Sequence, residues 1–327
     1  MNKVTIVIPN YNGEKWLKGC LDSLAPSVQN SAVAYDIIVV DDASTDKSRD
    51  IVSGYPDVRL IALEKNGGFS NAVNAGITAS EAPYVILLNN DTKAKPGFVQ
   101  SLYNAIKKDN KCFSVSASMR MWDREELMDS AGDIYCALGW SRSRGKGRPA
   151  TRYSRPCRIF SACAGAAIYR KAVFDEIGLF DPLHYMYLED LDICWRALLA
   201  GYSNKYDPGA VVIHYGSATT GSRYNSRKAT KRGGGEMNAV LEELEESLPD
   251  RNANVENDEK ELAEALNEFL TSLPDKNRDI FVLRYWHAES VANIAKIFDM
   301  TENSVSAILS RLRNKLHKYL TERGFEP

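Results

Sequence analysis

Residues 4–12 read VTIVIPNYN, an apolar run rich in β-branched residues that ends in a polar turn. Residues 37–44 (IIVVDDAS) and 84–92 (YVILLNNDT) repeat this pattern. Further short apolar runs lie at Val58–Ala62 and Phe113–Ser116, and helical patterns separate the runs, at Glu14–Leu24, Lys47–Tyr55, Ser70–Ala79 and Gly97–Lys107. Strands that alternate with helices are typical of a sheet covered on both faces. The sequence therefore predicts an α/β fold with a doubly wound, mostly parallel sheet.

Polar residues follow three of these predicted strands at the point where each ends. The three clusters are Pro9–Asn12, Asp41–Ser44 and Asn89–Thr92. Turn residues after a strand are common, so one cluster alone is a weak signal. Ligands of doubly wound sheets bind outside the carboxyl ends of the strands. Three clusters in this arrangement predict one shared site.

The overall composition is that of an ordinary globular protein. Lysine and arginine (41) nearly balance aspartate and glutamate (43), so bulk charge indicates neither a nucleic-acid nor a membrane partner. The six cysteines form no C-x-x-C pair, which disfavours a disulfide or zinc framework. No apolar run has the length of a signal peptide or of a membrane span. We expect a cytoplasmic protein, with peripheral attachment to the inner face of the membrane as an option.

Several motifs appear together and in order within residues 1–222. They are VTIVIPNYNGEKWL, DIIVVDDASTDKS, NGGFSNAVNAGI, YVILLNNDT, GLFDPLHYMYLEDLDICWRALLAGY and VVIHYGSAT. This set resembles the family-2 glycosyltransferases, which have the GT-A fold. The resemblance implies a metal-dependent, inverting transfer of a sugar from a nucleotide-diphosphate sugar to an acceptor hydroxyl.

The resemblance implies a nucleotide site on the first two strand ends. Asp42, with Asp41 beside it, would accept a hydrogen bond from the N–H of a uracil or thymine ring, and Tyr11 would pack against that ring. An alternative is that Asp41 and Asp42 cap the helix that begins near Lys47. The full predicted set is Pro9, Tyr11, Asn12, Asp41, Asp42, Asn66, Gly67 and Asn90.

The run Asn89, Asn90, Asp91 stands where this family carries its D-x-D metal motif. A hard divalent cation, Mg²⁺ or Mn²⁺, would neutralise the diphosphate there. Only Asp91 is a carboxylate, so we expect weaker metal binding than the usual motif gives. His214, after the strand at Ala210–Ile213, would complete the metal shell. The alternatives are an Asn-Asp turn and an ordinary structural histidine.

The pair Glu189 and Asp190 resembles the family's ED motif. An inverting transfer needs a general base for the proton of the acceptor hydroxyl, and the resemblance assigns this role to Asp190. Glu189 would orient or tune it. The alternative is a pair of surface carboxylates that cap the following helix. Asp192, two residues further on, should point elsewhere on that helix.

The sequence indicates the sugar donor and the acceptor less specifically than it indicates the reaction. The forms NNDT, SAGD (residues 130–133) and YLEDLDICWR look most like rhamnosyltransferases that use a dTDP-sugar, although UDP-sugars fit as well. The acceptor would be a glycan or a lipid-linked sugar of a cell-surface polysaccharide. Residues 120–160 lose the alternation, and Arg142, Arg144, Lys146 and Arg148 predict a mobile basic loop. This loop is either solvated or a lid that binds phosphate or acceptor.

The pattern changes after residue 222. Residues 223–257 are predicted to be an acidic linker. The strongly acidic stretch runs from Glu236 to Glu259, and Met237–Leu248 within it could be a short helix. Residues 258–327 are helical in period, with helices expected at Asp258–Ser272, Asp275–Trp286, Ser290–Phe298 and Glu302–Arg323. Thr301 is a good cap for the last helix, whose spacing predicts burial of Val305, Ile308, Leu309, Leu312 and Leu316.

The stretch from LPDKNRD to RNKLHKYL (residues 273–320) resembles region 4 of a sigma factor of the extracytoplasmic-function type, a helix-turn-helix module. This implies contacts with a promoter −35 element and with RNA polymerase. Ser304 and Ser306 stand where such helices often carry lysine, which would weaken DNA binding. The predicted DNA-binding residues are Asn303, Ser304, Ser306, Ser310, Arg311 and Arg313, and Lys315 and Lys318 would add phosphate contacts.

Two family patterns end close together around Ser222–Asn225, which indicates a join between two genes. The residues just after the join look like the end of sigma region 2, and the rest of that region is absent. Three hypotheses remain open. The chain is an active glycosyltransferase with a DNA-binding module, a sigma-like transcription regulator, or a fusion product in which neither activity is intact.

Overall fold

The computed structural model describes residues 3–135, 141–184, 188–216, 265–266, 268–285 and 289–323, without the side chain of Arg142. The chain divides into two compact units. The first comprises residues 1–135 and 141–219, and the second comprises residues 136–140 and 220–327. The predicted acidic linker at 223–257, with its helix at Met237–Leu248, lies outside the described residues, and so does the predicted join at Ser222–Asn225.

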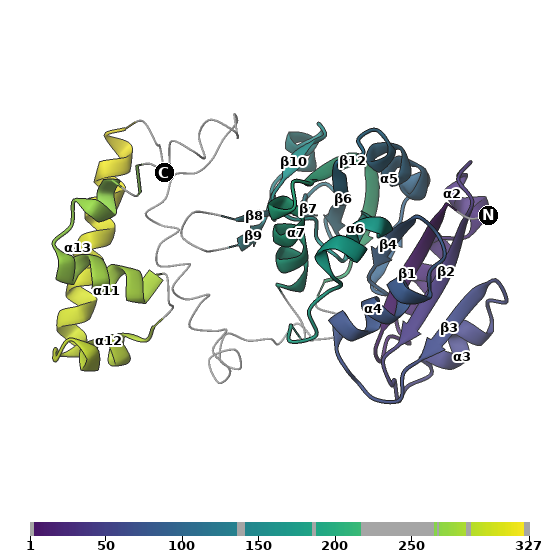
Figure 1. Cartoon of the computed structure of the whole chain (residues 1–327), viewed down its shortest axis with the longest axis horizontal. Helices are drawn as coiled ribbons and strands as arrows, with labels where there is room; N and C mark the ends of the chain where they lie inside the picture. Colours follow the sequence, from purple (N-terminus) through teal and green to yellow (C-terminus); the bar gives the residue numbers. More distant parts are fainter. Residues whose placement is uncertain are drawn as a thin grey trace. The chain divides into compact units, whose positions relative to one another are not determined.

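The first unit is built on a ten-stranded mixed sheet with the path β10-β12-β6-β11-β4-β1-β2-β3 (Figure 1). Neighbouring strands are parallel in the pairs β1–β2, β1–β4, β2–β3 and β6–β12. β11 runs antiparallel between β4 and β6. The predicted α/β sheet is therefore confirmed, with a reversed strand inside it. The path consists of β1 (Val4–Asn10), β2 (Tyr35–Asp41), β3 (Val58–Ala62), β4 (Tyr84–Leu88), β6 (Cys112–Met121), β10 (Cys157–Ile159), β11 (Ala166–Arg170) and β12 (Ser203–His214).

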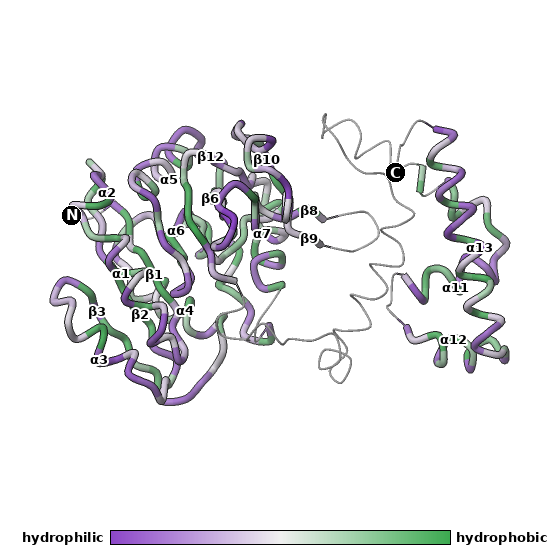
Figure 2. Tube along the Cα trace, turned by 180° about the vertical axis from the view of Figure 1, so that it is seen from behind, coloured by the Kyte–Doolittle hydropathy of each residue, from purple (hydrophilic) through white to green (hydrophobic). Residues whose placement is uncertain are grey.

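Helices cover both faces of this sheet, because the side chains of each central strand alternate between two cores. On β1, Ile6 and Ile8 enter one core and Val7 enters the other. The first core packs on α1 (Leu17–Ser23), α3 (Ser48–Ser53) and α5 (Phe98–Lys107); the second packs on α4 (Phe69–Ala79), α6 (Lys171–Ile177) and α7 (Glu189–Leu199). A short helix, α2 (Pro26–Gln29), follows α1. Figure 2 shows the apolar character of the central strand β1.

The expectation of a mobile basic loop within residues 120–160 is corrected, because much of this segment forms regular structure. These elements are β7 (Met128–Ser130), β8 (Asp133–Tyr135), β9 (Ser141–Ser143) and the 3₁₀ helix η1 (Ala150–Tyr153). The backbone of Arg144 donates to Gly132 O at 2.8 Å, and Gly147 N–H donates to Met128 O at 2.8 Å. Strands of three residues are too short to leave a period in the sequence, as is β5 (Thr92–Ala94), which pairs with β12.

The second unit is helical, with α11 (Asp275–Tyr285), α12 (Val291–Ile297) and α13 (Glu302–Thr321). The first predicted helix of this unit lies partly outside the described residues, and so does Trp286. The hydroxyl of Thr301 accepts a hydrogen bond from Ser304 N–H at 3.2 Å, which confirms the predicted cap. Val305, Leu309, Leu312 and Leu316 are buried as predicted, and Ile308 packs against them.

The described residues also contain helices and cysteines that bear on the chain's surroundings. None of the helices in the described part of the chain combines the length and the hydrophobicity that crossing a bilayer requires. The five cysteines within the described residues are free thiols: Cys20, Cys112, Cys157, Cys163 and Cys194.

We expect Thr301→Ala to destabilise the start of α13, because the amide of Ser304 loses its cap. A lost cap costs about 1 kcal/mol, so the first-turn amides should exchange their hydrogens roughly fivefold faster in hydrogen-exchange mass spectrometry of the full chain. Thr301→Ser keeps the hydroxyl and serves as the control. Equal exchange rates in the two variants would contradict the capping role.

Candidate active site

A buried row of hydrogen bonds joins the ends of three adjacent parallel strands. The amide nitrogen of Asn90, after β4, donates to Asn10 Oδ1 at 2.7 Å, and Asn10, at the end of β1, donates to Asp41 Oδ2 at 3.0 Å. All three residues are buried. Asn90 and Asp41, both predicted nucleotide contacts, thus bind neighbouring strands to one another. We call Asn90, Asn10 and Asp41 the strand-end row.

Asp41 has further partners on its own side of the row. Its Oδ1 accepts from Ser44 N–H at 3.1 Å and from the guanidinium of Arg49 at 2.6 Å. Burial disfavours the charged carboxylate, but the hydrogen bonds from Ser44, Arg49 and Asn10 outweigh it and hold the pKa of Asp41 below its ordinary value. Asp41 is therefore ionised, with two hydrogen-bond donors at Oδ1 and one at Oδ2.

Asp42 organises the loop before α4. Its Oδ1 accepts from Gly67 N–H at 2.8 Å, and its Oδ2 accepts from Gly68 N–H at 2.9 Å. The carboxylate thereby ties the end of β2 to the segment that contains Asn66 and Gly67, both predicted nucleotide contacts. Each oxygen retains a second lone pair for a base N–H, so the predicted contact between Asp42 and the base stays a prediction.

The turn after β1 lies over the loop after β2. Asn12 has a left-handed backbone (φ 48°), and its side-chain oxygen accepts from Thr45 N–H at 2.9 Å. Its own N–H donates to Ser44 Oγ at 2.9 Å. Pro9 is partly exposed, and Tyr11 is 38% exposed at the surface. An exposed ring beside two ordered loops is a suitable surface for a planar base.

The two predicted metal ligands lie together. His214 Nε2 is 3.4 Å from Asp91 Oδ1, and His214 Nδ1 is 2.6 Å from Asp129 Oδ2. Burial disfavours the imidazolium, but hydrogen bonds to Asp129 and Asp91 outweigh it and raise the pKa of His214 to about 9. A carboxylate behind a histidine orients the ring toward a metal in many proteins.

The donor set fits a cation that the protein holds jointly with a substrate. Among the residues that the structure describes, no three histidine, cysteine, aspartate or glutamate side chains gather as a complete metal site. Asp91 supplies one donor, and His214 supplies a second at Nε2 once the cation has displaced the proton from that nitrogen. Mg²⁺ and similar ions commonly take one or two protein ligands and complete their shell with water and phosphate oxygens. The residues therefore suit a cation bound with a diphosphate.

A stack of three aromatic rings borders this pair and was not predicted. Tyr215 packs on Trp16 at a centroid distance of 3.9 Å and on Trp122 at 3.5 Å. The backbone N–H of Tyr215 donates to Asp91 O at 3.0 Å, and that of Trp122 donates to His214 O at 3.1 Å. The stack therefore fixes the two segments that carry Asp91 and His214. The one signal in the sequence that could have indicated this aromatic stack is that Tyr215 directly follows His214.

The predicted base lies at the start of α7. Asp190 is half-buried; its Oδ2 accepts from Ala164 N–H at 3.3 Å and its Oδ1 accepts from Leu191 N–H at 2.9 Å. Burial raises the pKa of Asp190 in spite of these backbone hydrogen bonds. Glu189 is buried next to it. Asp192 pairs with Arg196 at 2.6 Å and so points elsewhere, as predicted.

A continuous series of contacts brings the clusters to one edge of the sheet. The strand-end row ends at Asn90, next to Asp91. Asn89 N–H donates to Gly165 O at 2.9 Å, and the neighbouring Ala164 donates to Asp190. The predicted convergence of the strand ends is confirmed, and the role of each residue stays a prediction.

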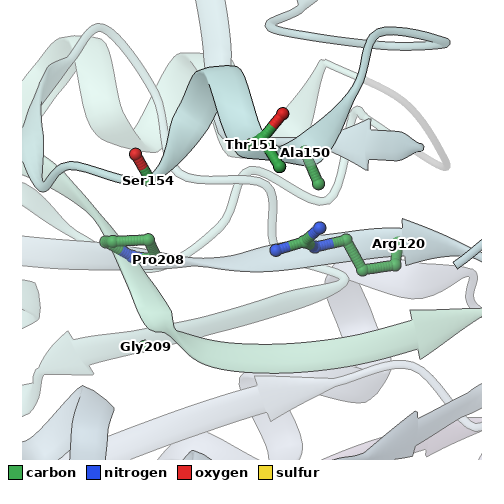
Figure 3. A pocket seen from close by; sticks show the side chains of 6 residues that line it. All are labelled: Arg120, Ala150, Thr151, Ser154, Pro208 and Gly209. Atoms are coloured by element: carbon green, nitrogen blue, oxygen red, sulfur yellow. The ribbon is translucent and has the colours of Figure 1, made fainter. Parts of the chain in front are cut away.

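A separate pocket lies elsewhere in the first unit. It has a volume of about 460 Å³ and is lined by Arg120, Ala150, Thr151, Ser154, Pro208 and Gly209 (Figure 3). The guanidinium of Arg120 extends between η1 and the Pro208–Gly209 segment of β12 (Figure 3). None of the predicted nucleotide, metal or base residues lines it.

The predicted DNA-binding residues occupy α13. Its exposed side includes Asn303, Ser304, Ser306, Ser310 and Arg311. Arg313 differs from them, because it is half-buried and its guanidinium donates to the Tyr285 hydroxyl at 2.7 Å. Arg313 thus binds α13 to α11 in addition to any contact with phosphate.

Comparison with known proteins identifies the class. The fold is similar to GT-A-type glycosyltransferase structures. The structure of GalNAc-T7 with UDP, GalNAc and Mn²⁺ matches with a TM-score of 0.54 at 17% identity, over 66% of this chain and 44% of that one. S. aureus TarS matches with a TM-score of 0.50 at 19% identity, over 98% of this chain and 53% of that one.

Residues 5–178 match the model of glycosyl transferase family 2, and the chain belongs to this family. Residues 263–316 match the model of sigma-70 region 4. One relative is the N-acetylglucosaminyl-diphospho-decaprenol L-rhamnosyltransferase of Mycobacterium tuberculosis, 27% identical over 66% of this chain and 77% of the relative. Another is the poly-β-1,6-N-acetyl-D-glucosamine synthase of Staphylococcus epidermidis, 23% identical over 72% of this chain and 55% of the relative.

We expect Gly13→Ala to disrupt the strand-end row, because a Cβ at this position would overlap the side-chain amides of Asn10 and Asn90. Forced repacking of this kind costs about 1–3 kcal/mol, measurable as a lower free energy of unfolding in chemical denaturation. Gly19→Ala is the control. Its Cβ would meet only the end of the flexible Lys93 side chain, so stability should be unchanged or higher. Equal stability of the two variants would refute the constraint.

Proposed function

We propose that the first unit is an inverting glycosyltransferase, which moves a sugar from a nucleotide-diphosphate sugar to a hydroxyl of a glycan or lipid-linked acceptor. One observation carries this proposal: a half-buried Asp190 lies at the same sheet edge as the Asp91–His214 pair and the strand-end row. A base and a diphosphate-binding pair on one edge are the two parts that such a transfer requires.

The chemistry assigns one proton transfer to Asp190. The Asp190 carboxylate takes the proton of the acceptor hydroxyl while that oxygen forms a bond to the anomeric carbon. The bond from this carbon to the diphosphate oxygen breaks, and the nucleoside diphosphate leaves with the electron pair. Attack opposite to the leaving group inverts the anomeric configuration. The backbone N–H groups of Ala164 and Leu191 hold the two carboxylate oxygens in place for this step.

Asp91 and His214 would hold Mg²⁺ or Mn²⁺, which supplies charge neutralisation for the departing diphosphate when bound. Asp129 keeps the His214 ring oriented through its 2.6 Å contact with Nδ1. Asp42 and Tyr11 are assigned to the base of the nucleotide, with Asn12 and the Asn66–Gly67 loop around them.

The relatives support a proposal for the donor and the location. The mycobacterial relative, by its name, transfers L-rhamnose to a decaprenol-linked sugar. We therefore favour a dTDP-linked rhamnose as donor over a UDP-sugar, and a polyprenol-linked acceptor in polysaccharide synthesis. An acceptor of this kind would place the protein in the cytoplasm, peripherally at the inner face of the membrane.

We expect Asp190→Asn to lower kcat by about 10²–10⁴-fold, because the amide does not take up the acceptor proton. Transfer from dTDP-rhamnose and from UDP-sugars, with and without Mn²⁺, measures this loss. Nucleotide affinity in calorimetry should stay unchanged, since the hydrogen bonds of Asp190 within the described residues are to Ser161, Ala164 and Leu191, none of which is a predicted nucleotide contact. Asp192→Asn, on the same helix, is the control and should retain activity. A parallel loss of nucleotide binding would contradict the assignment of Asp190 as base.

A second function, promoter binding, is favoured by the sigma-70 region 4 match and by the exposed side of α13. The proposed contacts are with a −35 element and, through the same module, with RNA polymerase.

If the second function holds, a −35 duplex should shift in a gel at low salt and lose the shift as salt rises. Arg311→Ala should weaken binding by roughly tenfold, because a phosphate contact of the exposed guanidinium is lost. Arg278→Ala, on α11, is a control that removes a charge already paired with Asp275. No shift at low salt would reject this function. The absence of both transfer and DNA binding would favour a fusion product without either activity.

A further inference from the structure

The pocket beside η1 lies where β12 departs from its regular pairing with β6. Asp207 and Val211 of β12 pair with consecutive residues of β6, so the ladder between the two strands omits residues 208–210. Pro208 has no N–H for the ladder, and Gly209 N–H donates to Asp207 Oδ1 at 3.1 Å. β-bulges are often found next to functional sites. This bulge forms one wall of the pocket, because Pro208 and Gly209 belong to its lining.

Arg120 is the one charged side chain among the described residues that line the pocket. Its guanidinium extends between η1 and the bulge (Figure 3). Arg120 is half-buried, and its Nε donates to Ser118 Oγ at 2.9 Å. Within the described part of the chain, its other N–H groups have no hydrogen-bond partner, and no carboxylate forms an ion pair with it. Since charged groups that are withdrawn from water are normally paired, this guanidinium is suited to an anion from outside the chain.

Two hydroxyl groups line the pocket on the η1 side. Thr151 lies in η1 and Ser154 directly follows it, and both residues are exposed. Neither side chain forms a hydrogen bond with another residue in the ranges that the structure describes. A hydroxyl donates one hydrogen bond, and a guanidinium donates several in a planar fork. The pocket therefore offers an anion hydrogen-bond donors from more than one element.

The chain around these hydroxyls is basic. Residues 141–160 contain no aspartate or glutamate, and seven of them are lysine or arginine. Arg155 directly follows Ser154 and is exposed. Asp207, at the start of the bulge, does not line the pocket, and its Oδ2 accepts from the Ser101 hydroxyl at 2.7 Å. Such surroundings favour a phosphate group, which carries up to about two negative charges near neutral pH, over a singly charged carboxylate.

We propose that this pocket binds a phosphate group, at a site separate from the one assigned to sugar transfer. The guanidinium of Arg120 binds phosphate oxygens with its planar fork, and the hydroxyls of Thr151 and Ser154 bind the same group. The pocket volume of about 460 Å³ is typical of small-ligand sites, roughly 300–1,000 Å³, so the phosphate can belong to a larger molecule. This chemistry has two sources, a soluble phosphate compound and the headgroup of an anionic lipid. No residue of the transfer site takes part, so the inference goes beyond the proposed function.

The test measures the binding of inorganic phosphate and of pyrophosphate to the full chain by calorimetry, in EDTA so that no cation bridges either anion to Asp91 and His214. Arg120→Gln should weaken the affinity by roughly tenfold or more, because charge-assisted hydrogen bonds are lost. Arg124→Gln is the matched control. It removes the same charge from an exposed arginine that pairs with Asp123 outside the pocket, so the affinity should stay at the wild-type value.

Thr151→Val combined with Ser154→Ala provides a second variant, at exposed positions, if Arg120→Gln does not fold; it should weaken binding about fivefold. Sedimentation with vesicles of phosphatidylcholine, with and without phosphatidic acid, separates the two sources. Binding of the free anions that the pocket variants lose assigns the site to a soluble phosphate compound. Sedimentation with phosphatidic acid alone that these variants lose assigns it to a lipid headgroup.

In both cases the backbone amide NMR signals of Ser154 and Gly209 should shift during the titration, while those of Asp91 and His214 stay in place. Equal affinity of the wild-type chain and the pocket variants for every probe would overturn the proposal. So would the absence of binding to phosphate, to pyrophosphate and to phosphatidic acid vesicles, or shifts centred on Asp91 and His214. None of these measurements needs sugar transfer, so a failure of the proposed function leaves their outcome unchanged.

Discussion

The site depends on the strand-end row, in which the amide of Asn90 binds Asn10 and the amide of Asn10 binds Asp41. These polar groups are buried, and a buried group left without a partner costs about 1–3 kcal/mol. The row therefore fixes how the ends of β4, β1 and β2 lie against one another. Asp42 and Asp91 directly follow members of the row, so their positions are set by bonds between side chains that do not themselves need to touch a substrate.

Most of the architecture could be predicted from the sequence, because long apolar runs and helical periods are local patterns. Val4–Asn10 and Tyr84–Leu88 are strands as predicted, and Thr301 caps α13. Contacts between residues that are distant in the sequence could not be predicted in this way. Asp129, which contacts His214, is 85 residues away from it along the chain, and the hydrogen bonds of Asp41 to Asn10 and Arg49 were not predicted either. The three-residue strands β7 to β10 left no period to detect.

Each of the two units has a buried apolar core and leaves a polar surface exposed. In the first, two cores fix a sheet whose carboxyl-end edge stays polar, and every residue assigned to sugar transfer belongs to this unit. In the second, the apolar side of α13 packs on α11 and α12, while its polar side, from Asn303 to Arg311, stays exposed. The chemistry proposed for the first unit requires no residue of the second, so each can be tested separately.

The central claim is that one sheet edge binds the cation and the diphosphate together. The most direct measurement is paramagnetic broadening of backbone amide NMR signals by Mn²⁺ in the presence of dTDP. The account predicts broadening at Leu88, Asp91, Ala164 and His214, with sharp signals retained at Tyr84 and Arg170, at the opposite ends of β4 and β11. Broadening centred on Tyr84 and Arg170, or none at His214, would contradict it.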